Sequence, residues 1–236
     1  MNGSLIRLDS VSKHYATPAG EVRAVDGVTL TVEPGTSVAV TGPSGCGKST
    51  LLGLIAGLEA PTSGLLSIGD QEVSSLPDRE RAQLRRDELG LVFQSDNLLP
   101  FLTALENVSL QLALKDPTAD FERCRELLVG LDLGEKADAL PDQLSGGQRQ
   151  RVAVARALVH GPRVVLADEP TGELDAGNSE IVIDQLLAAQ QESGTTLVVV
   201  THDPAVARRL DRTVRLSDGR LVDSPLEPPT SGRADA

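Results

Sequence analysis

The glycine-rich segment TGPSGCGKSTLL, residues 41–52, constrains the fold of this chain more than any other feature. It follows the continuous small apolar run SVAVTG at 37–42 and leads into STLLGLIAGL at 49–58, whose apolar residues recur at helical spacing. This order of strand, glycine loop and helix is typical of a phosphate-binding loop. Glycines let backbone N–H groups point at phosphate oxygens, and the helix adds its positive N-terminal end. A glycine-rich turn before a helix is the weaker alternative.

The loop matches the pattern GxxxxGK[ST], which assigns chemistry to individual residues. Lys48 is expected to reach the β and γ phosphates as a positive charge, and the Ser49 hydroxyl is expected to ligate Mg²⁺. Cys46 is interpreted as a small residue of the loop and not as a redox switch. The predicted binding residues of this segment are Gly42, Pro43, Ser44, Gly45, Cys46, Gly47, Lys48, Ser49 and Thr50.

A second apolar run, VVLADEP at 164–170, ends in two carboxylates. Asp168 is the predicted metal ligand from a strand beside the loop, and Glu169 is the predicted base that aligns and deprotonates a water molecule against the γ phosphate. Two solvated acids at a strand end would be the better interpretation if the glycine loop were not in the same chain.

Composition excludes several classes of function. The chain has 236 residues and a net charge of −12, from 34 acidic and 22 basic residues, which argues against nucleic acid as a partner. Cys46 and Cys124 lie far apart without a CxxC pattern, so neither a disulfide framework nor a zinc site is indicated. Neither a signal peptide nor a run of about 18 apolar residues is recognisable, so any membrane-spanning part is expected to come from another chain.

The remaining patterns predict an α/β fold: a P-loop NTPase core with an N-terminal antiparallel β-subdomain and an inserted helical subdomain at roughly 95–160. The ATP-binding domain is expected to span 1–221, and the Pro- and Ser-rich segment 222–236 is expected to be a disordered tail. The predicted elements are short antiparallel strands at 5–11, 21–25 and 27–32, a hairpin at 65–73 across Gly69 and Asp70, mostly helical structure from 78 to 160, strands at 163–168 and 195–202, and a helix at 179–191 ending near Gly194.

The segment LSGGQ at 144–148 begins a long helical pattern. Ser145 and Gln148 have the spacing of a capping box, which is the structural explanation for them. Capping does not explain Gly146 and Gly147, because each glycine costs about 1 kcal/mol relative to alanine in a helix. Bare N–H groups and a hydroxyl at a helix start predict a second phosphate-binding surface.

Taken together, these segments resemble the ATP-binding subunits of ABC transporters over about residues 5–221. The resemblance rests on the Walker A loop (42–49), the signature LSGGQ (144–148) and the Walker B strand (164–169). It implies ATP and Mg²⁺ as cofactors, and a homodimer in which two ATP molecules lie between the Walker A loop of one chain and LSGGQ of the other. The implied partner is a separate transmembrane permease, which would hold the protein at the cytoplasmic face of the membrane.

The resemblance also implies roles for four single residues. Tyr15 matches the aromatic residue that stacks on adenine, and Gln94 matches the glutamine that contacts Mg²⁺ and the partner interface. Asp175 matches the aspartate of the D-loop, and His202 matches the switch histidine that faces the γ phosphate. Each residue also has an ordinary structural interpretation. Their shared order and spacing favours the functional one.

Within the family, the run at 84–110 and the TG at 171–172 are similar to the ATPases of lipoprotein-releasing and macrolide-exporting systems. Glu173 departs from the asparagine expected there. Export or extraction is therefore the predicted activity. The alternative is a mechanotransmitting ATPase of a cell-division complex that controls a cell-wall hydrolase without transport.

Overall fold

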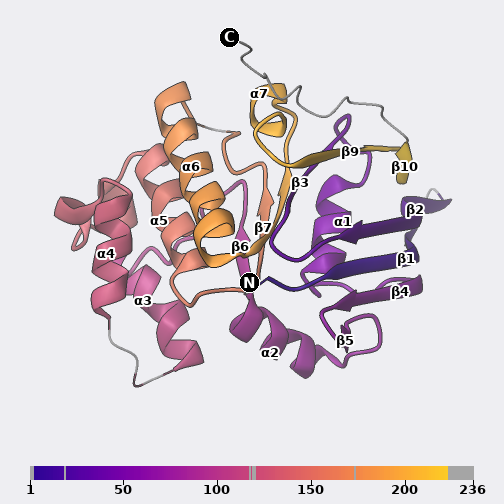
Figure 1. Ribbon diagram of the computed structural model, residues 1–236, viewed down its shortest axis with the longest axis horizontal. Helices are drawn as coiled ribbons and strands as arrows, with labels where there is room; N and C mark the ends of the chain where they lie inside the picture. The colour runs from indigo at the N-terminus through magenta and orange to yellow at the C-terminus, as the bar shows by residue number, and fades with distance from the viewer. Residues whose placement is uncertain (1–2, 19, 117, 119–120, 173, 223–236) are drawn as a thin grey trace, which may run out of the picture.

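The computed structural model describes residues 3–18, 20–116, 118, 121–172 and 174–222. Its elements form a mostly parallel sheet, an antiparallel sheet and a separate group of helices (Figure 1). These parts agree with the predicted α/β class.

The core sheet has the strand order β10-β9-β3-β8-β7-β6. All neighbouring pairs are parallel except β10 and β9. The inner strands are buried, aliphatic runs, as expected of parallel strands covered on both faces. The strands are β3 (Ser37–Thr41), β6 (Leu89–Val92), β7 (Val164–Asp168), β8 (Thr196–Val200), β9 (Arg212–Ser217) and β10 (Arg220–Val222).

The antiparallel sheet has the order β2-β1-β4-β5. Its strands are β1 (Ile6–Thr17), β2 (Gly20–Val32), β4 (Ser63–Ile68) and β5 (Gln71–Glu72). The prediction of short, separate strands at 21–25 and 27–32 was wrong, because β2 continues through Gly27. Register shifts in the β1–β2 ladder absorb the irregularity that the sequence suggests as a break. The predicted hairpin at Gly69 and Asp70 is confirmed.

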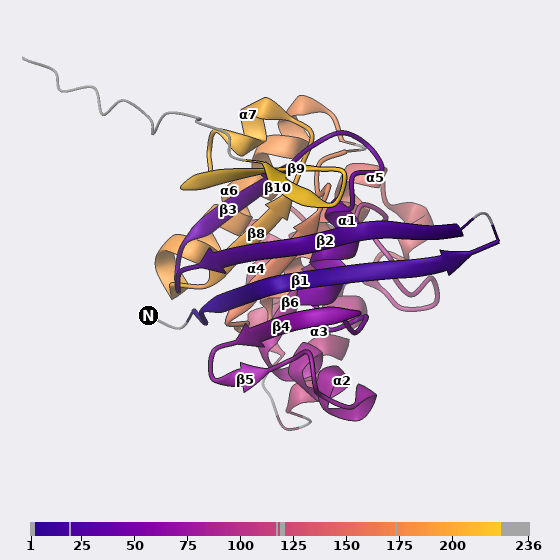
Figure 2. The same ribbon diagram turned by 90° about the vertical axis from the view of Figure 1, so that its right-hand side faces the viewer.

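Helix α1 (Lys48–Ile55) lies between the two sheets (Figures 1 and 2). Its buried leucines join one apolar cluster with side chains from both sheets. The opposite face of the core sheet packs on α5 (Gly146–Leu158) and on α6 (Ala176–Ser193), in a second cluster. Helix α6 ends as predicted at Gly194, whose φ of 67° is the left-handed conformation of a C-cap.

The group of helices consists of α3 (Ala104–Lys115), α4 (Glu122–Gly130) and a second buried side of α5, with short 3₁₀ turns η1 (Gly134–Lys136) and η2 (Pro141–Gln143). They share a third apolar cluster. Preceding them are α2 (Asp78–Glu88) and β6. The predicted helical character of 78–160 misses β6, because LGLV is too short to show a strand period and is recognisable only once it pairs with β7.

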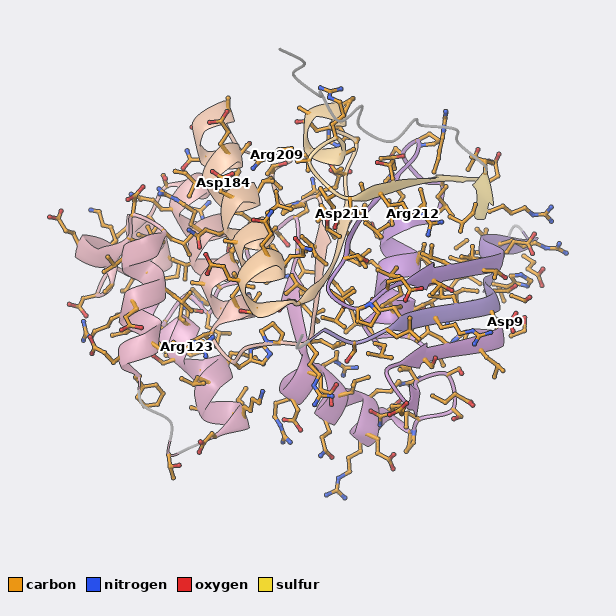
Figure 3. The ribbon with its side chains drawn as sticks, viewed as in Figure 1. Asp9, Arg123, Asp184, Arg209, Asp211 and Arg212 are labelled. Atoms are coloured by element: carbon orange, nitrogen blue, oxygen red, sulfur yellow. The ribbon has the colours of Figure 1, made fainter. Side chains whose placement is uncertain are left out.

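Polar contacts connect the C-terminal part of the fold to the core. Arg209, which follows α7 (Pro204–Ala207), forms an ion pair with Asp184 of α6, and Figure 3 labels both side chains. Asp211 accepts hydrogen bonds from the backbone N–H and hydroxyl of Ser37, at 2.8 and 2.7 Å. Strand β10 includes Val222, one residue beyond the predicted domain boundary. The predicted tail at 223–236 lies outside the described residues.

Candidate active site

The predicted loop, acids and histidine meet at one edge of the core sheet. Parallel neighbours β3, β8 and β7 all end there, so the segments after them lie side by side. A pocket of about 480 Å³ opens at this edge, and Gly45, Lys48, Ser49, Gln94, Asp168 and Glu169 are among the residues that line it.

Two glycines of the loop are required by the surrounding structure. A Cβ at Gly42 would lie 2.1 Å from the carbonyl oxygen of Leu216, and a Cβ at Gly47 would lie 1.9 Å from that of Ala24. Both residues also have positive φ values, 149° and 103°. The buried Cys46 between them packs in the apolar cluster between the sheets, as its interpretation as a small residue requires.

Lys48 folds its side chain back over the loop. Its ammonium group donates hydrogen bonds to the carbonyl oxygens of Gly42 and Pro43, at 2.9 and 3.0 Å. The positive charge is thus held at the loop, within reach of an anion bound there.

Asp168 presents a carboxylate oxygen that has no protein partner. Its Oδ1 atom is buried without a hydrogen bond. Burial raises the pKa of Asp168, and a hydrogen bond with Ser49 opposes that rise. The described residues contain no cluster of three or more His, Cys, Asp or Glu side chains that could hold a metal. A cation here would therefore depend on Asp168, Ser49 and phosphate oxygens, a donor set that suits Mg²⁺.

Glu169 and His202 form a pair beside the loop. Glu169 Oε2 lies 2.9 Å from His202 Nδ1, and the His202 backbone N–H donates to the same oxygen at 3.3 Å. Glu169 has a φ of 46°, a left-handed conformation that is costly for a residue with a side chain and that often occurs at functional sites. The His202 side chain is 70% exposed, whereas that of Glu169 is 14% exposed.

Gln94 and Tyr15 lie at two margins of the pocket. Gln94, which follows β6, is exposed and also borders a small cleft that includes Gly146. The Tyr15 hydroxyl donates to Glu59 at 2.7 Å, and Tyr15 pairs across β1 and β2 with Val22, which lines the pocket.

The LSGGQ segment forms the predicted capping box at the start of α5. Ser145 Oγ accepts from the Gln148 backbone N–H, and Gln148 Oε1 accepts from that of Ser145. A Cβ at Gly147 would lie 2.6 Å from the Asn178 side chain, but one at Gly146 would meet only the end of Arg149, at 3.9 Å. All of 144–148 is described, and none of it lines the pocket of the glycine loop.

Asp175 is the N-cap of α6 and accepts hydrogen bonds from the backbone N–H and side-chain amide of Asn178, at 2.9 and 2.8 Å. It thus lies beside LSGGQ of its own chain, through Asn178 and Gly147. Glu173, the departure from the subgroup pattern, lies outside the described residues.

Three side chains that connect α5 to the Gln94 segment were not predicted from the sequence. Arg149 forms an ion pair with Asp96 at 2.8 Å, and Arg156 donates to the carbonyl oxygens of Asp96 and Asn97. The buried Gln150 donates to the Phe93 carbonyl at 3.0 Å. Three polar residues on the inner side of a helix were a signal for such contacts, but nothing in the sequence names their partners.

The apolar residues that follow Gln94 divide between two environments. Leu98 packs on the apolar cluster of the helical group. Leu99 lines a groove of about 430 Å³ together with Leu91, Phe93 and Leu110. Phe101, two residues further along the chain, is 71% exposed.

Comparisons with known proteins agree with this geometry. A family described as "ABC transporter" matches residues 25–172. The macrolide export ATP-binding/permease protein MacB of Hyphomonas neptunium is 46% identical over 94% of this chain, which spans 35% of that relative's length. The lipoprotein-releasing system ATP-binding protein LolD of Legionella pneumophila is 43% identical, over 94% of this chain and 98% of that protein.

Two solved structures of the ATP-binding cassette MJ0796 are similar in fold, each with a TM-score of 0.88 over 92% of this chain and 97% of the other. Both are dimeric, at 42% and 43% identity, and the first is a post-hydrolysis state bound to ADP and Pi. No helix in the described part of this chain combines the length and apolar character needed to cross a membrane. The chain therefore belongs to the ABC transporter family, as an ATP-hydrolysing subunit.

Proposed function

We propose that this protein binds and hydrolyses MgATP as a head-to-tail homodimer and thereby drives a separate transmembrane permease that exports or extracts a substrate. It would act at the cytoplasmic face of the membrane, held there by the permease. The glycine loop of one chain and the LSGGQ segment of the other would enclose each ATP molecule.

In this mechanism the loop N–H groups and Lys48 bind the phosphates, and the Lys48 ammonium exchanges its carbonyl partners for phosphate oxygens. Glu169 accepts a proton from the attacking water. His202, which contacts Glu169, orients that carboxylate and faces the γ phosphate. Asp168 and Ser49, with Gln94 at the pocket margin, would hold Mg²⁺, which neutralises charge on the phosphates when bound.

The observation that carries this proposal is the open space in front of Gly146. Gly42 and Gly47 of the loop are explained by contacts within the chain, but a side chain at position 146 would clash with nothing in it. A glycine in the first turn still costs helix stability, about 1 kcal/mol relative to alanine. A second molecule that brings phosphate against this N–H group accounts for that cost, and dimeric relatives support this explanation.

The partner surface is proposed from the groove at Leu99 and from Phe101. Leu91, Phe93, Leu99 and Leu110 line the groove, and an exposed phenylalanine two residues after Leu99 is typical of a protein contact. Hydrogen bonds from Arg149 and Arg156 connect the Gln94 segment near this groove to α5, which begins at LSGGQ. Docking there can therefore be coupled to movement of LSGGQ. The names of MacB and LolD support export or extraction as the activity.

The test is the Glu169→Gln variant, which keeps the shape of the side chain and removes the base. We expect hydrolysis to fall by roughly 10²- to 10⁴-fold, while ATP binding persists. ATP should then convert the variant from monomer to a stable dimer on a sizing column, and ADP should not. A variant that binds ATP tightly and stays monomeric at all protein concentrations would contradict the shared site.

A further inference from the structure

Tyr15 is held by two charged side chains that lie outside the recognised motifs. Its hydroxyl donates to Glu59 Oε2 at 2.7 Å, and the Lys13 ammonium lies 5.2 Å from the centre of its ring. Lys13 also forms an ion pair with Glu59 at 3.1 Å and donates to the Ala60 carbonyl at 2.9 Å. The ring is thus fastened at its hydroxyl and faces a cation on one side.

The three side chains come from different parts of the fold. Lys13 and Tyr15 belong to β1, whereas Glu59 follows the end of α1, the helix that starts in the phosphate loop. Tyr15 pairs directly with Val22 on β2, so both side chains face the same side of the ladder. Val22 is 50% exposed and lines the pocket, which places Tyr15 beside the pocket mouth.

The titration behaviour of the pair is consistent with a stable phenol donor and a charged acceptor. Burial and the Glu59 hydrogen bond raise the pKa of Tyr15, while a hydrogen bond with Thr50 lowers it. The Tyr15 hydrogen bond lowers the pKa of Glu59, burial opposes that change, and Lys13 lowers the pKa further. A hydrogen bond from a phenol to a carboxylate is stronger than one between neutral groups, so it limits rotation of the ring before a ligand arrives.

We propose that Glu59 is a positioning residue for nucleotide binding: together with Lys13, it fixes the Tyr15 ring so that the face opposite Lys13 stacks on the adenine of ATP. This inference rests on the proposed function and deepens it. Glu59 does not touch the reacting atoms. Its effect passes through Tyr15 to the base, and it should leave the phosphate loop unaltered.

The chain offers a direct optical measurement of this contact. Tyr15 is the one tyrosine in the sequence, and tryptophan is absent from it, so tyrosine emission reports on this ring alone. We expect ATP and ADP to change that emission saturably in the intact protein. Inorganic tripolyphosphate occupies the same loop without a base and should leave the emission unchanged.

Variants of Glu59 then distinguish an effect on the position of the Tyr15 ring from a general loss of folded structure. Glu59→Leu should weaken ATP binding by about five- to tenfold, the loss expected for one hydrogen bond, with no change in tripolyphosphate binding by calorimetry. Glu59→Gln retains an acceptor oxygen and should bind ATP almost as tightly as the intact protein. Glu126→Leu, a matched change at an exposed position of α4, should alter neither affinity.

A double-mutant cycle with Tyr15→Phe tests the path of the effect. Tyr15→Phe should weaken ATP binding by the same factor as Glu59→Leu, and the double variant should lose no more than either single one. In steady-state hydrolysis, KM should rise while kcat stays unchanged.

Three results would overturn the inference. ATP affinity unchanged in Glu59→Leu would remove the role of Glu59, and equal losses for ATP and tripolyphosphate would show that Glu59 only maintains the fold. Losses that multiply in the double variant would show that Glu59 acts on something other than Tyr15. In these cases the proposed function stands, whereas an intact protein that bound neither ATP nor tripolyphosphate would overturn both.

Discussion

The glycine loop at 42–49 and the LSGGQ segment at 144–148 are both glycine-rich helix starts, yet the structure treats them differently. In the loop, Gly42 and Gly47 lie against carbonyl oxygens of the same chain, so the local fold itself requires glycine. In LSGGQ, Gly147 packs on Asn178, but a Cβ at Gly146 would meet only the end of Arg149, at 3.9 Å. Contacts within the chain therefore account for Gly42 and Gly47 of the loop, but they do not account for Gly146, where we propose that a second molecule binds.

The largest difference between the two regions should appear on replacing one glycine in each. Gly47→Ala should lower the free energy of unfolding by roughly 2–4 kcal/mol, because its Cβ has no room and its φ is unfavourable. Gly146→Asp should change it by less than about 0.5 kcal/mol, since an acid in the first turn suits the helix dipole. Urea unfolding measures both.

ATP-dependent dimerisation should be strongly affected by Gly146→Asp, although this change has little effect on stability. In the Glu169→Gln background, Gly146→Asp should abolish the ATP-dependent dimer, because its carboxylate would oppose a phosphate. Nucleotide binding by the monomer should persist. Normal ATP-dependent dimerisation of the Gly146→Asp protein would contradict the proposal that a phosphate of the second molecule's nucleotide lies against Gly146.

A smaller effect is expected at Tyr15, which lies beside the pocket of the glycine loop and is proposed to stack on adenine. Tyr15→Ala should weaken ATP binding by about tenfold, the loss of one stacking contact, with kcat at saturating ATP unchanged. The measurement is calorimetry together with steady-state hydrolysis. A collapse of kcat at unchanged affinity would mean that Tyr15 has another role.

The smallest effect on the isolated chain is expected at the exposed Phe101, which we propose to be part of the permease contact. Phe101→Asp should leave the ATPase of the purified subunit unchanged, because the side chain is already in solvent. Co-purification with a detergent-solubilised membrane protein from the source cells should be lost. Loss of ATPase, or unfolding, would instead assign Phe101 to the packing of the subunit.

The same contrast explains what could be predicted from the sequence. The loop, the acids after β7 and the histidine after β8 follow from local order, because parallel strands bring their carboxyl ends together. Contacts between distant segments were not predictable. Neither the Asp96–Arg149 ion pair nor the hydrogen bond from Tyr15 to Glu59 produces a periodic pattern in the sequence. Strand β6 was missed for the same reason, since its four residues acquire their identity by pairing with β7.

The central claim is that each ATP site combines the loop of one chain with LSGGQ of another, and mixed dimers test it most directly. One protein carries Lys48→Ala and the other Ser145→Arg, both in the Glu169→Gln background so that hydrolysis cannot empty the site. Each protein alone has a lesion in every site. A mixed dimer has one doubly damaged site and one intact site.

The measurement is retention of labelled ATP by the mixture after rapid gel filtration, with mixed dimers confirmed by two affinity tags. We predict retention well above the average of the two separate proteins, because the intact shared site traps nucleotide. Retention no greater than that average, despite confirmed mixed dimers, would mean that loop and LSGGQ of the same chain form each site, and would contradict the account.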